Sequence, residues 1–353
     1  MTRPSLDSLG GWSAVLGRLA DGADLTADQA HAALTEILAG EASDARIAGF
    51  IVALRLKGET VDEVSGMVEA MLEASEPLDL DGEPIDIVGT GGSAIRRLHA
   101  LNVSTMASIV AAGAGVAVCK HGNRKASSTS GSFDLLDELG VGIDLDGAAV
   151  ARCVREVGIG FAFARTYHPA MRYAGPVRAE LGIPTVFNLL GPLSHPSGTR
   201  RQVIGVGDPR SIELVAGVMA TRGGERAMVV HGADGLDEIT LTGPTTVHQV
   251  EHGRVEVWEL EPTVLGLAVR TIDELRGGDP ATNADLARRM LAGEPGAVRD
   301  IVTVNAAAGI WVGGAVDTLS DGLEAARAAI DDGSAAAVLD RLVEVSNRTD
   351  PLG

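Results

Sequence analysis

The sequence is poor in aromatic residues, cysteine and positive charge, and the shortages of cysteine and of positive charge each exclude a class of protein. Aromatic side chains make up 3% of the chain, and the two cysteines, Cys119 and Cys153, are too few for a disulfide framework. The 29 lysines and arginines are outnumbered by 48 aspartates and glutamates, and the net charge of −19 argues against a nucleic-acid partner. Apolar runs are short or interrupted by glycine, so we expect no signal peptide, no membrane span and a cytoplasmic location.

The first 76 residues have the pattern of a small all-helical domain. Apolar side chains recur at helical spacing over residues 12–75. Thr26 and Thr60 are each followed three residues later by Gln29 or Glu63, which is the pattern of a capping box at a helix start. The polar stretch 77–84 then predicts a hinge between domains.

From residue 85 onward, short apolar runs alternate with alanine-rich helical segments. This alternation is typical of βαβ units and predicts an α/β domain with a mostly parallel central sheet flanked by helices. A chain of 353 residues is long enough for both domains. The segment 184–196 is expected to be rigid and rich in turns, as part of a long crossover between strands.

A glycine-rich turn follows the first predicted strand. Residues 85–88 are apolar, and the next five are Gly-Thr-Gly-Gly-Ser at 89–93. Glycines let the backbone adopt positive φ and approach a ligand closely, and successive N–H groups in such a turn suit an anion. Asn102-Val-Ser-Thr105 then opens a helix, whose free backbone donors also favour negative charge.

A cationic segment follows the second predicted strand, at 115–119. It reads Lys120-His-Gly-Asn-Arg-Lys125 and leads into Ser127 and Ser128. Ligands of open parallel sheets lie at the carboxyl ends of the strands, so the glycine turn and this segment predict one site for a phosphorylated small molecule.

Asp237 and Glu238 follow a later strand, at 227–231. They are either a solvated acidic loop or, beside a pyrophosphate, a Mg²⁺ site.

These motifs resemble the anthranilate phosphoribosyltransferase family. The resemblance rests on GTGG, NVST, KHGNRKASS, NLLGPL at 188–193 and GLDE at 235–238, in this order along nearly the whole chain. It implies that the phosphoribosyl group of phosphoribosyl pyrophosphate is transferred to the amine of anthranilate. It also implies two Mg²⁺ ions, a homodimer through the helical domain, no nucleic acid and no membrane. Residues 168–196 would return to the helical domain (1–76), and 85–165 with 200–353 would form the large domain.

The family's site residues carry over to matching positions. The resemblance implies electrostatic roles for Lys120 and Arg124, anthranilate contacts at Gly89, His121, Asn123, His168 and Arg178, and metal contacts at Ser104, Asp237 and Glu238. No general base is predicted. Contacts to phosphoribosyl pyrophosphate are implied for Gly89, Gly91, Gly92, Ser93, Asn102, Val103, Ser104, Thr105, Lys120, His121, Gly122, Asn123, Arg124, Lys125, Ala126, Ser127, Ser128 and Ser132.

The chain departs from the family pattern in the loop after the glycines. Ser93 replaces the usual aspartate, Ala100 replaces a threonine, and the loop is about three residues longer and carries Arg96 and Arg97. Either these arginines neutralise phosphate, or the loop is solvated with its arginines outward. The departure leaves room for a different amino- or hydroxybenzoate as acceptor. Ser93 also leaves open a degenerate scaffold. Two rivals share the broad architecture. One is a pyrimidine nucleoside phosphorylase, against which Arg178, NLLGPL and the Asp237-Glu238 pair argue, and the other is a non-catalytic nucleic-acid-binding relative, against which the net charge argues.

Overall fold

A computed structural model describes residues 3–91, 101–124 and 129–348 of the chain. The N-terminal part is helical, as predicted, and both capping boxes are present, at Thr26 with Gln29 and at Thr60 with Glu63. Its elements are η1 (Asp7–Leu9), α1 (Gly11–Ala20), α2 (Ala27–Ala39), α3 (Asp44–Lys57) and α4 (Val61–Glu73).

A mostly parallel sheet forms the centre of the larger part, which confirms the predicted fold class. Its strands are β1 (Asp86–Gly89), β2 (Val118–Gly122), β3 (Ile159–Phe163), β4 (Arg201–Gly205), β5 (Arg226–Gly232), β6 (Thr245–Glu251) and β7 (Arg254–Leu260). Five of them pair in the order β1-β4-β5-β6-β7, with β1, β4 and β5 parallel and β6 and β7 an antiparallel hairpin. Strands β2 and β3 form a separate parallel pair. A bridge between Ile85 and Val118 joins this pair to β1.

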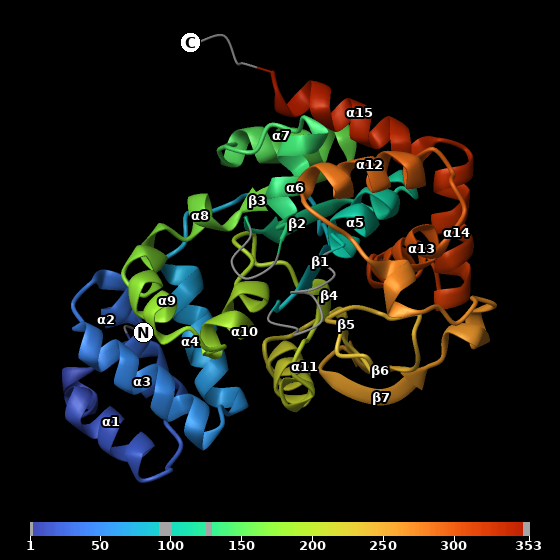
Figure 1. Cartoon of the computed structure of the whole chain (residues 1–353). Coiled ribbons are helices and arrows are strands. Elements are labelled where there is room, and N and C mark those ends of the chain that lie inside the picture. Colours follow the sequence, from blue (N-terminus) through green and yellow to red (C-terminus); the bar gives the residue numbers. More distant parts are fainter. Residues whose placement is uncertain (1–2, 92–100, 125–128, 349–353) are drawn as a thin grey trace.

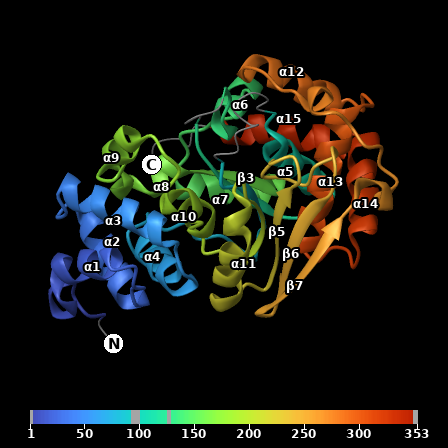
Figure 2. The same ribbon diagram turned by 60° about the horizontal axis from the view of Figure 1, so that its bottom comes forward.

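Helices cover both faces of the sheet (Figure 2). Side chains that alternate along the strands enter two different hydrophobic clusters: Val203 and Met228 join the cluster of α5 and α13, whereas Ile204 and Val229 join the cluster of α11. The helices of this part are α5 (Val103–Gly113), α6 (Ser132–Leu139), α7 (Gly147–Val157), α11 (Ile212–Thr221), α12 (Pro280–Leu291), α13 (Ala297–Val312), α14 (Leu319–Asp331) and α15 (Ser334–Ser346). Short 3-10 turns lie at η3 (Pro209–Ser211), η4 (Pro262–Leu265) and η5 (Ile272–Leu275).

The connection from β3 to β4 leaves the sheet and runs along the N-terminal helices (Figure 1). It contains α8 (Ala164–Tyr167), η2 (Pro169–Arg172), α9 (Gly175–Leu181) and α10 (Val186–Leu193). Helix α9 packs against α3, and α10 packs against α3 and α4. Our expectation of a turn-rich segment at 184–196 was wrong, because α10 is a regular helix there. Leu189 and Leu190 are buried among the N-terminal helices, and this burial outweighs the helix-breaking tendency of Pro192 near the end.

The N-terminal helices and one face of the sheet share a single hydrophobic cluster. Buried residues of α2 and α4, such as Leu34 and Met67, belong to the same cluster as Ile204 and Val229 of the sheet. The two parts of the molecule therefore have continuous apolar contact. Within the described residues, the structure contains no helix of the length and apolar character needed to span a bilayer.

Candidate active site

The glycine turn lies at the point where the order of the strands in the sheet reverses. The chain runs from β1 outward to β2 and β3, and then returns to the other side of β1 with β4 and β5. Ligands of open α/β sheets bind at such a switch point, beyond the carboxyl ends of the strands. The loops after β1 and β4 are joined there, because the Thr90 N–H donates to the Gly205 carbonyl over 2.8 Å.

The acidic loop after β5 closes against this turn. The Gly91 N–H donates to Oδ2 of Asp237 over 2.9 Å, and Gly91 has a φ of +64°, which favours glycine. A Cβ on Gly89 would lie 2.3 Å from Asp237 Oδ2, and a Cβ on Gly205 would lie 1.7 Å from the Asp237 carbonyl oxygen. Asp237 and Glu238 are both buried, so the interpretation as a solvated acidic loop was wrong.

Helix α5 packs against β1, and its first turn is also buried. Val103, Ser104 and Thr105 form its first turn, and the N-cap Asn102 makes no capping bond with its side chain. Instead, Asn102 Oδ1 accepts from the Ser130 hydroxyl over 2.9 Å and from Asn283 Nδ2 over 2.8 Å, while Asn102 Nδ2 donates to the Ser130 carbonyl over 3.2 Å. The Asn102 amide therefore ties together three segments around the predicted phosphate site.

Lys120 and His121 lie inside β2 rather than beyond its end, because the strand begins three residues later than predicted. Lys120 is buried, and its ammonium donates to the Ile87 carbonyl over 2.5 Å. His121 Nδ1 lies 3.2 Å from the Gly191 carbonyl, while Nε2 has no hydrogen-bond partner among the described residues. Burial holds the pKa of His121 well below its usual value, so the ring is neutral at pH 7, with Nδ1 as donor and Nε2 as acceptor.

Arg124 is already engaged in ion pairs. Its guanidinium contacts Asp134 over 3.1 Å and Asp137 over 3.0 Å, both on α6, and these carboxylates raise its pKa. Its charge in this conformation is directed to α6, not to a substrate. Ser132 begins α6 and packs against Gly122, where an added Cβ would lie 3.1 Å from the Ser132 hydroxyl.

Two of the five predicted acceptor residues, His168 and Arg178, lie on the connection through the helical part. The Arg178 guanidinium stacks 5.0 Å from the Phe187 ring centre, and burial lowers its pKa. His168 is buried, with its ring centre 5.1 Å from that of His121, and burial lowers its pKa to about 4. The structure thus brings His168 next to His121.

A cavity of about 270 Å³ lies between the helical part and the switch point, lined by residues of both. Thr90 and Gly91 form one wall, and Thr185, Asn188 and Leu189 of the α10 segment form another. The glycine turn therefore faces a space between the two parts of the molecule.

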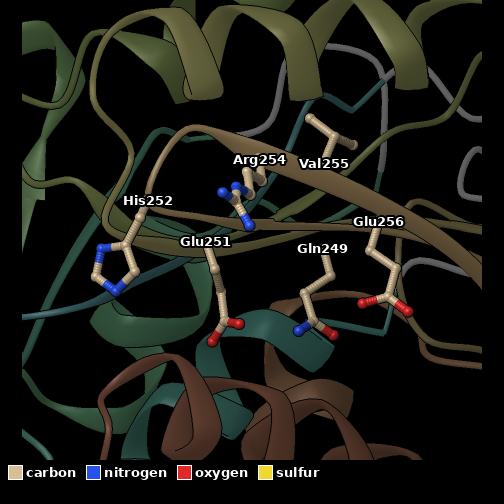
Figure 3. Close-up of a pocket in the computed structure, with 6 residues that line it drawn as sticks. All are labelled: Gln249, Glu251, His252, Arg254, Val255 and Glu256. Atoms are coloured by element: carbon tan, nitrogen blue, oxygen red, sulfur yellow. The ribbon is translucent and has the colours of Figure 1, made fainter.

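A second hollow, of about 620 Å³, lies at the tip of the β6–β7 hairpin (Figure 3). The described residues that line it include none of the predicted site residues. The side chains of Gln249, Glu251 and Glu256 point to the same side of the hairpin, and Glu251 pairs with Arg226 over 3.0 Å. This acidic, open surface does not suit a phosphorylated ligand, so we place the site at the switch point.

Some predicted residues lie outside the part of the chain that the structure describes. These are Gly92, Ser93, Lys125, Ala126, Ser127 and Ser128, together with Arg96, Arg97 and Ala100 of the unusual loop. Two residues of the site were missed. Asn283 and Gly205 contact the site from distant elements, and no short motif identifies them.

The family of the chain is clear once this geometry is compared with known proteins. A family model described as glycosyl transferase family, helical bundle domain, matches residues 13–75, and one described as glycosyl transferase family, a/b domain, matches residues 81–336. These models cover most of the chain. The protein is thus a glycosyl transferase with a helical bundle and an α/β domain.

Individual relatives define the family more narrowly. The chain is 51% identical over 342 residues to the anthranilate phosphoribosyltransferase of Rhodococcus jostii, covering 95% of this chain and 93% of that protein. The structure of the Thermus thermophilus enzyme matches with a TM-score of 0.89 and 42% identity, covering 95% and 99% of the chains. The Saccharomyces cerevisiae enzyme with phosphoribosyl pyrophosphate and Mg matches with a TM-score of 0.86 and 28% identity, covering 95% and 97%. That enzyme has also been solved with 4-fluoroanthranilate. The chain belongs to the anthranilate phosphoribosyltransferases, which confirms the resemblance.

Proposed function

We propose that the protein transfers the phosphoribosyl group of phosphoribosyl pyrophosphate to the amine of anthranilate, releasing pyrophosphate, as the second step from chorismate to tryptophan. The observation that carries this proposal is the glycine turn fixed on Asp237 at the switch point of the sheet, facing the space between two domains. Backbone donors beside buried carboxylates and a buried lysine suit a sugar pyrophosphate.

The donor side would act by positioning and by electrostatics. Backbone N–H groups at the glycine turn and at the start of α5 would hold the phosphates, with Ser104 and Thr105 adding hydroxyl groups. Lys120 would supply positive charge from β2, the strand beside β1, since its ammonium donates to the Ile87 carbonyl. Charge that builds on the departing pyrophosphate would be stabilised by these fixed donors, which need no reorganisation during the reaction.

The carboxylates fit a magnesium ion bound together with substrate. No group of three or more histidine, cysteine, aspartate or glutamate side chains with metal-site geometry occurs among the described residues. Mg²⁺ is usually held by one or two carboxylates plus substrate phosphates, and buried Asp237 and Glu238 provide such a pair. When bound, the ion would neutralise negative charge on the pyrophosphate. We propose two ions per chain, with Ser104 at the second.

The acceptor side would bind a planar acid. Arg178, packed on Phe187, would recognise the carboxylate through its planar guanidinium. Neutral His121 presents an unprotonated Nε2 that would accept a hydrogen bond from the amine, with Gly89, Asn123 and His168 completing the contacts. The amine of anthranilate is weakly basic and would attack unprotonated, so no strong general base is required.

Fluorescence of anthranilate tests the proposal directly. We expect the purified protein to deplete anthranilate fluorescence only when phosphoribosyl pyrophosphate and Mg²⁺ are both present. Asp237→Asn should lower kcat/KM by about 100-fold and raise the Mg²⁺ concentration required about tenfold, because one carboxylate charge at the ion is lost. Asp285→Asn, which removes an exposed carboxylate on α12, is the matched control and should leave both values unchanged.

A panel of acceptors decides between the proposed function and the competing enzyme activities. Faster turnover of a different aminobenzoate or of a hydroxybenzoate would identify a paralogue, and phosphorolysis of a pyrimidine nucleoside would identify a phosphorylase. No turnover with any acceptor would contradict the proposal.

We also propose a homodimer through the helical domain and a cytoplasmic location. Light scattering of the purified protein tests the homodimer.

A further inference from the structure

The sheet is interrupted between β1 and β2, directly beneath the candidate site. The ladder begins normally, because the Ile85 N–H donates to the Ala117 carbonyl over 2.9 Å and the Cys119 N–H donates to the Ile85 carbonyl over 2.9 Å. In a parallel pair the next bonds would join Ile87 to Cys119 and His121. Instead, within the described part of the chain, the two strands share only the bridge at Ile85.

Three buried side chains satisfy three of the four backbone groups that the ladder leaves open. The His121 N–H donates to Oδ1 of Asp86 over 3.2 Å, and the Ile87 carbonyl accepts from Lys120. The Cys119 carbonyl accepts from His195 Nε2 over 2.8 Å. Burying charged and polar groups costs free energy, whereas ordinary strand pairing would not require them. The gap is therefore a specific feature with its own set of partners.

Gln202 connects this gap to the end of α10. It lies opposite Asp86 in the register of β1 and β4, and it is buried. Its Nε2 donates to Oδ2 of Asp86 over 3.2 Å and to the Pro192 carbonyl over 2.8 Å, so both amide hydrogens are used. Burial raises the pKa of Asp86 to about 7, and the nearby Lys120 ammonium opposes this shift.

We propose that Asp86 and Gln202 form a positioning clamp that sets the width of the β1–β2 gap and fixes the last turn of α10 against it. This inference rests on the proposed function, because the groups that the clamp holds lie on the proposed acceptor side. Asp86 holds the backbone of His121, and Gln202 holds Pro192, next to the Gly191 carbonyl that orients the His121 ring.

Within the clamp, Gln202 acts on the acceptor side rather than on the donor side. The start of α5, which we assign to phosphoribosyl pyrophosphate, is held separately by Asn102 with Ser130 and Asn283. The hydrogen bonds of Gln202 run instead to Asp86 and Pro192. Loosening the clamp at Gln202 should therefore affect the KM for anthranilate and leave the KM for phosphoribosyl pyrophosphate nearly unchanged.

Gln202→Met tests the clamp, since methionine has a similar length and no amide. We expect the KM for anthranilate to rise about tenfold, while the KM for phosphoribosyl pyrophosphate stays within about twofold. Gln249→Met is the matched control. It also replaces a strand glutamine and removes one hydrogen bond, from Trp258 Nε1 over 3.2 Å, but lies on the hairpin away from the site, so both KM values should be those of the wild type.

Gln202→Glu keeps the proposal testable if the methionine variant does not fold. In this variant two carboxyl groups would be in contact and would share a proton. The substituted side chain could donate a hydrogen bond to Asp86 or to the Pro192 carbonyl only when it is protonated, so the clamp would depend on pH. We expect the KM for anthranilate in this variant to approach the wild-type value as pH falls from 8 to 6. Equal increases in both KM values, or wild-type values in both variants, would overturn the clamp. Absence of transfer by the wild type would instead overturn the proposed function.

Discussion

A single absent methyl group at Gly205 allows the acidic loop to close over the sheet. The Asp237 carbonyl oxygen would lie 1.7 Å from a Cβ at this position, and that contact is with backbone, which cannot rotate away. We expect Gly205→Ala to push Asp237 away from Gly91 and to lower the free energy of unfolding by about 1–3 kcal/mol, as overpacked sites in proteins do. Urea unfolding measures the loss, and the Mg²⁺ dependence of turnover should shift with it.

Gly17→Ala is the control for this change. Gly17 lies within α1, and an added Cβ would meet nothing within 4 Å. Alanine is favoured over glycine in a helix interior, so this variant should gain about 0.5–1 kcal/mol. If Gly205→Ala were as stable and as active as the wild type, the close approach of Asp237 to the sheet would be contradicted.

At the scale of elements, a side chain of α12 holds the start of α5 by a hydrogen bond. Asn283 of α12 is fully buried, donates to Asn102 Oδ1 over 2.8 Å and accepts from the Gly278 N–H over 2.8 Å. Asn283→Ala leaves the buried Asn102 Oδ1 and the partly buried Gly278 N–H without that partner, which costs about 1–3 kcal/mol of stability. We expect the KM for phosphoribosyl pyrophosphate to rise several-fold and that for anthranilate to change little, which steady-state kinetics with each substrate varied in turn would measure. A selective rise in the KM for anthranilate would contradict this assignment.

The sequence was informative where function depends on local pattern. Both capping boxes formed where predicted, strands and helices alternate as predicted, and the described part of the glycine turn follows β1, because each feature depends on neighbouring residues. The position of Lys120 inside β2 and the helix α10 were not predicted. Both depend on burial against distant segments: Lys120 on the Ile87 carbonyl, and Leu190 among the N-terminal helices. Asn283 and Gly205 were missed for the same reason, since their partners are far away in the sequence.

At the scale of the whole molecule, two of the three connections between the two parts meet at a cluster of buried histidines. The chain leaves the α/β part near His168 and returns near His195, and the His121 ring centre lies 5.1 Å from that of His168 and 5.6 Å from that of His195. The Nε2–H of His195 donates to the Cys119 carbonyl, while its Nδ1 accepts from the Ser197 N–H. This bonding fixes the neutral form of the ring.

Acid should therefore loosen the molecule at this junction. Burial lowers the pKa of His195 to about 4, below the unfolded value of about 6.5, so the unfolded chain binds one more proton between these limits. His195 thus contributes stability above pH 6.5 that is lost as the pH falls toward 4. Asp86, with a folded pKa of about 7, works in the opposite direction but is the same in both proteins under comparison. Between pH 6 and 5, the His195→Gln variant should lose about 1.2 kcal/mol less stability than the wild type in urea unfolding. Glutamine is the substitution of choice because its amide can still donate to the Cys119 carbonyl. If the stabilities of the two proteins had parallel pH profiles, His195 would not be held neutral by the fold.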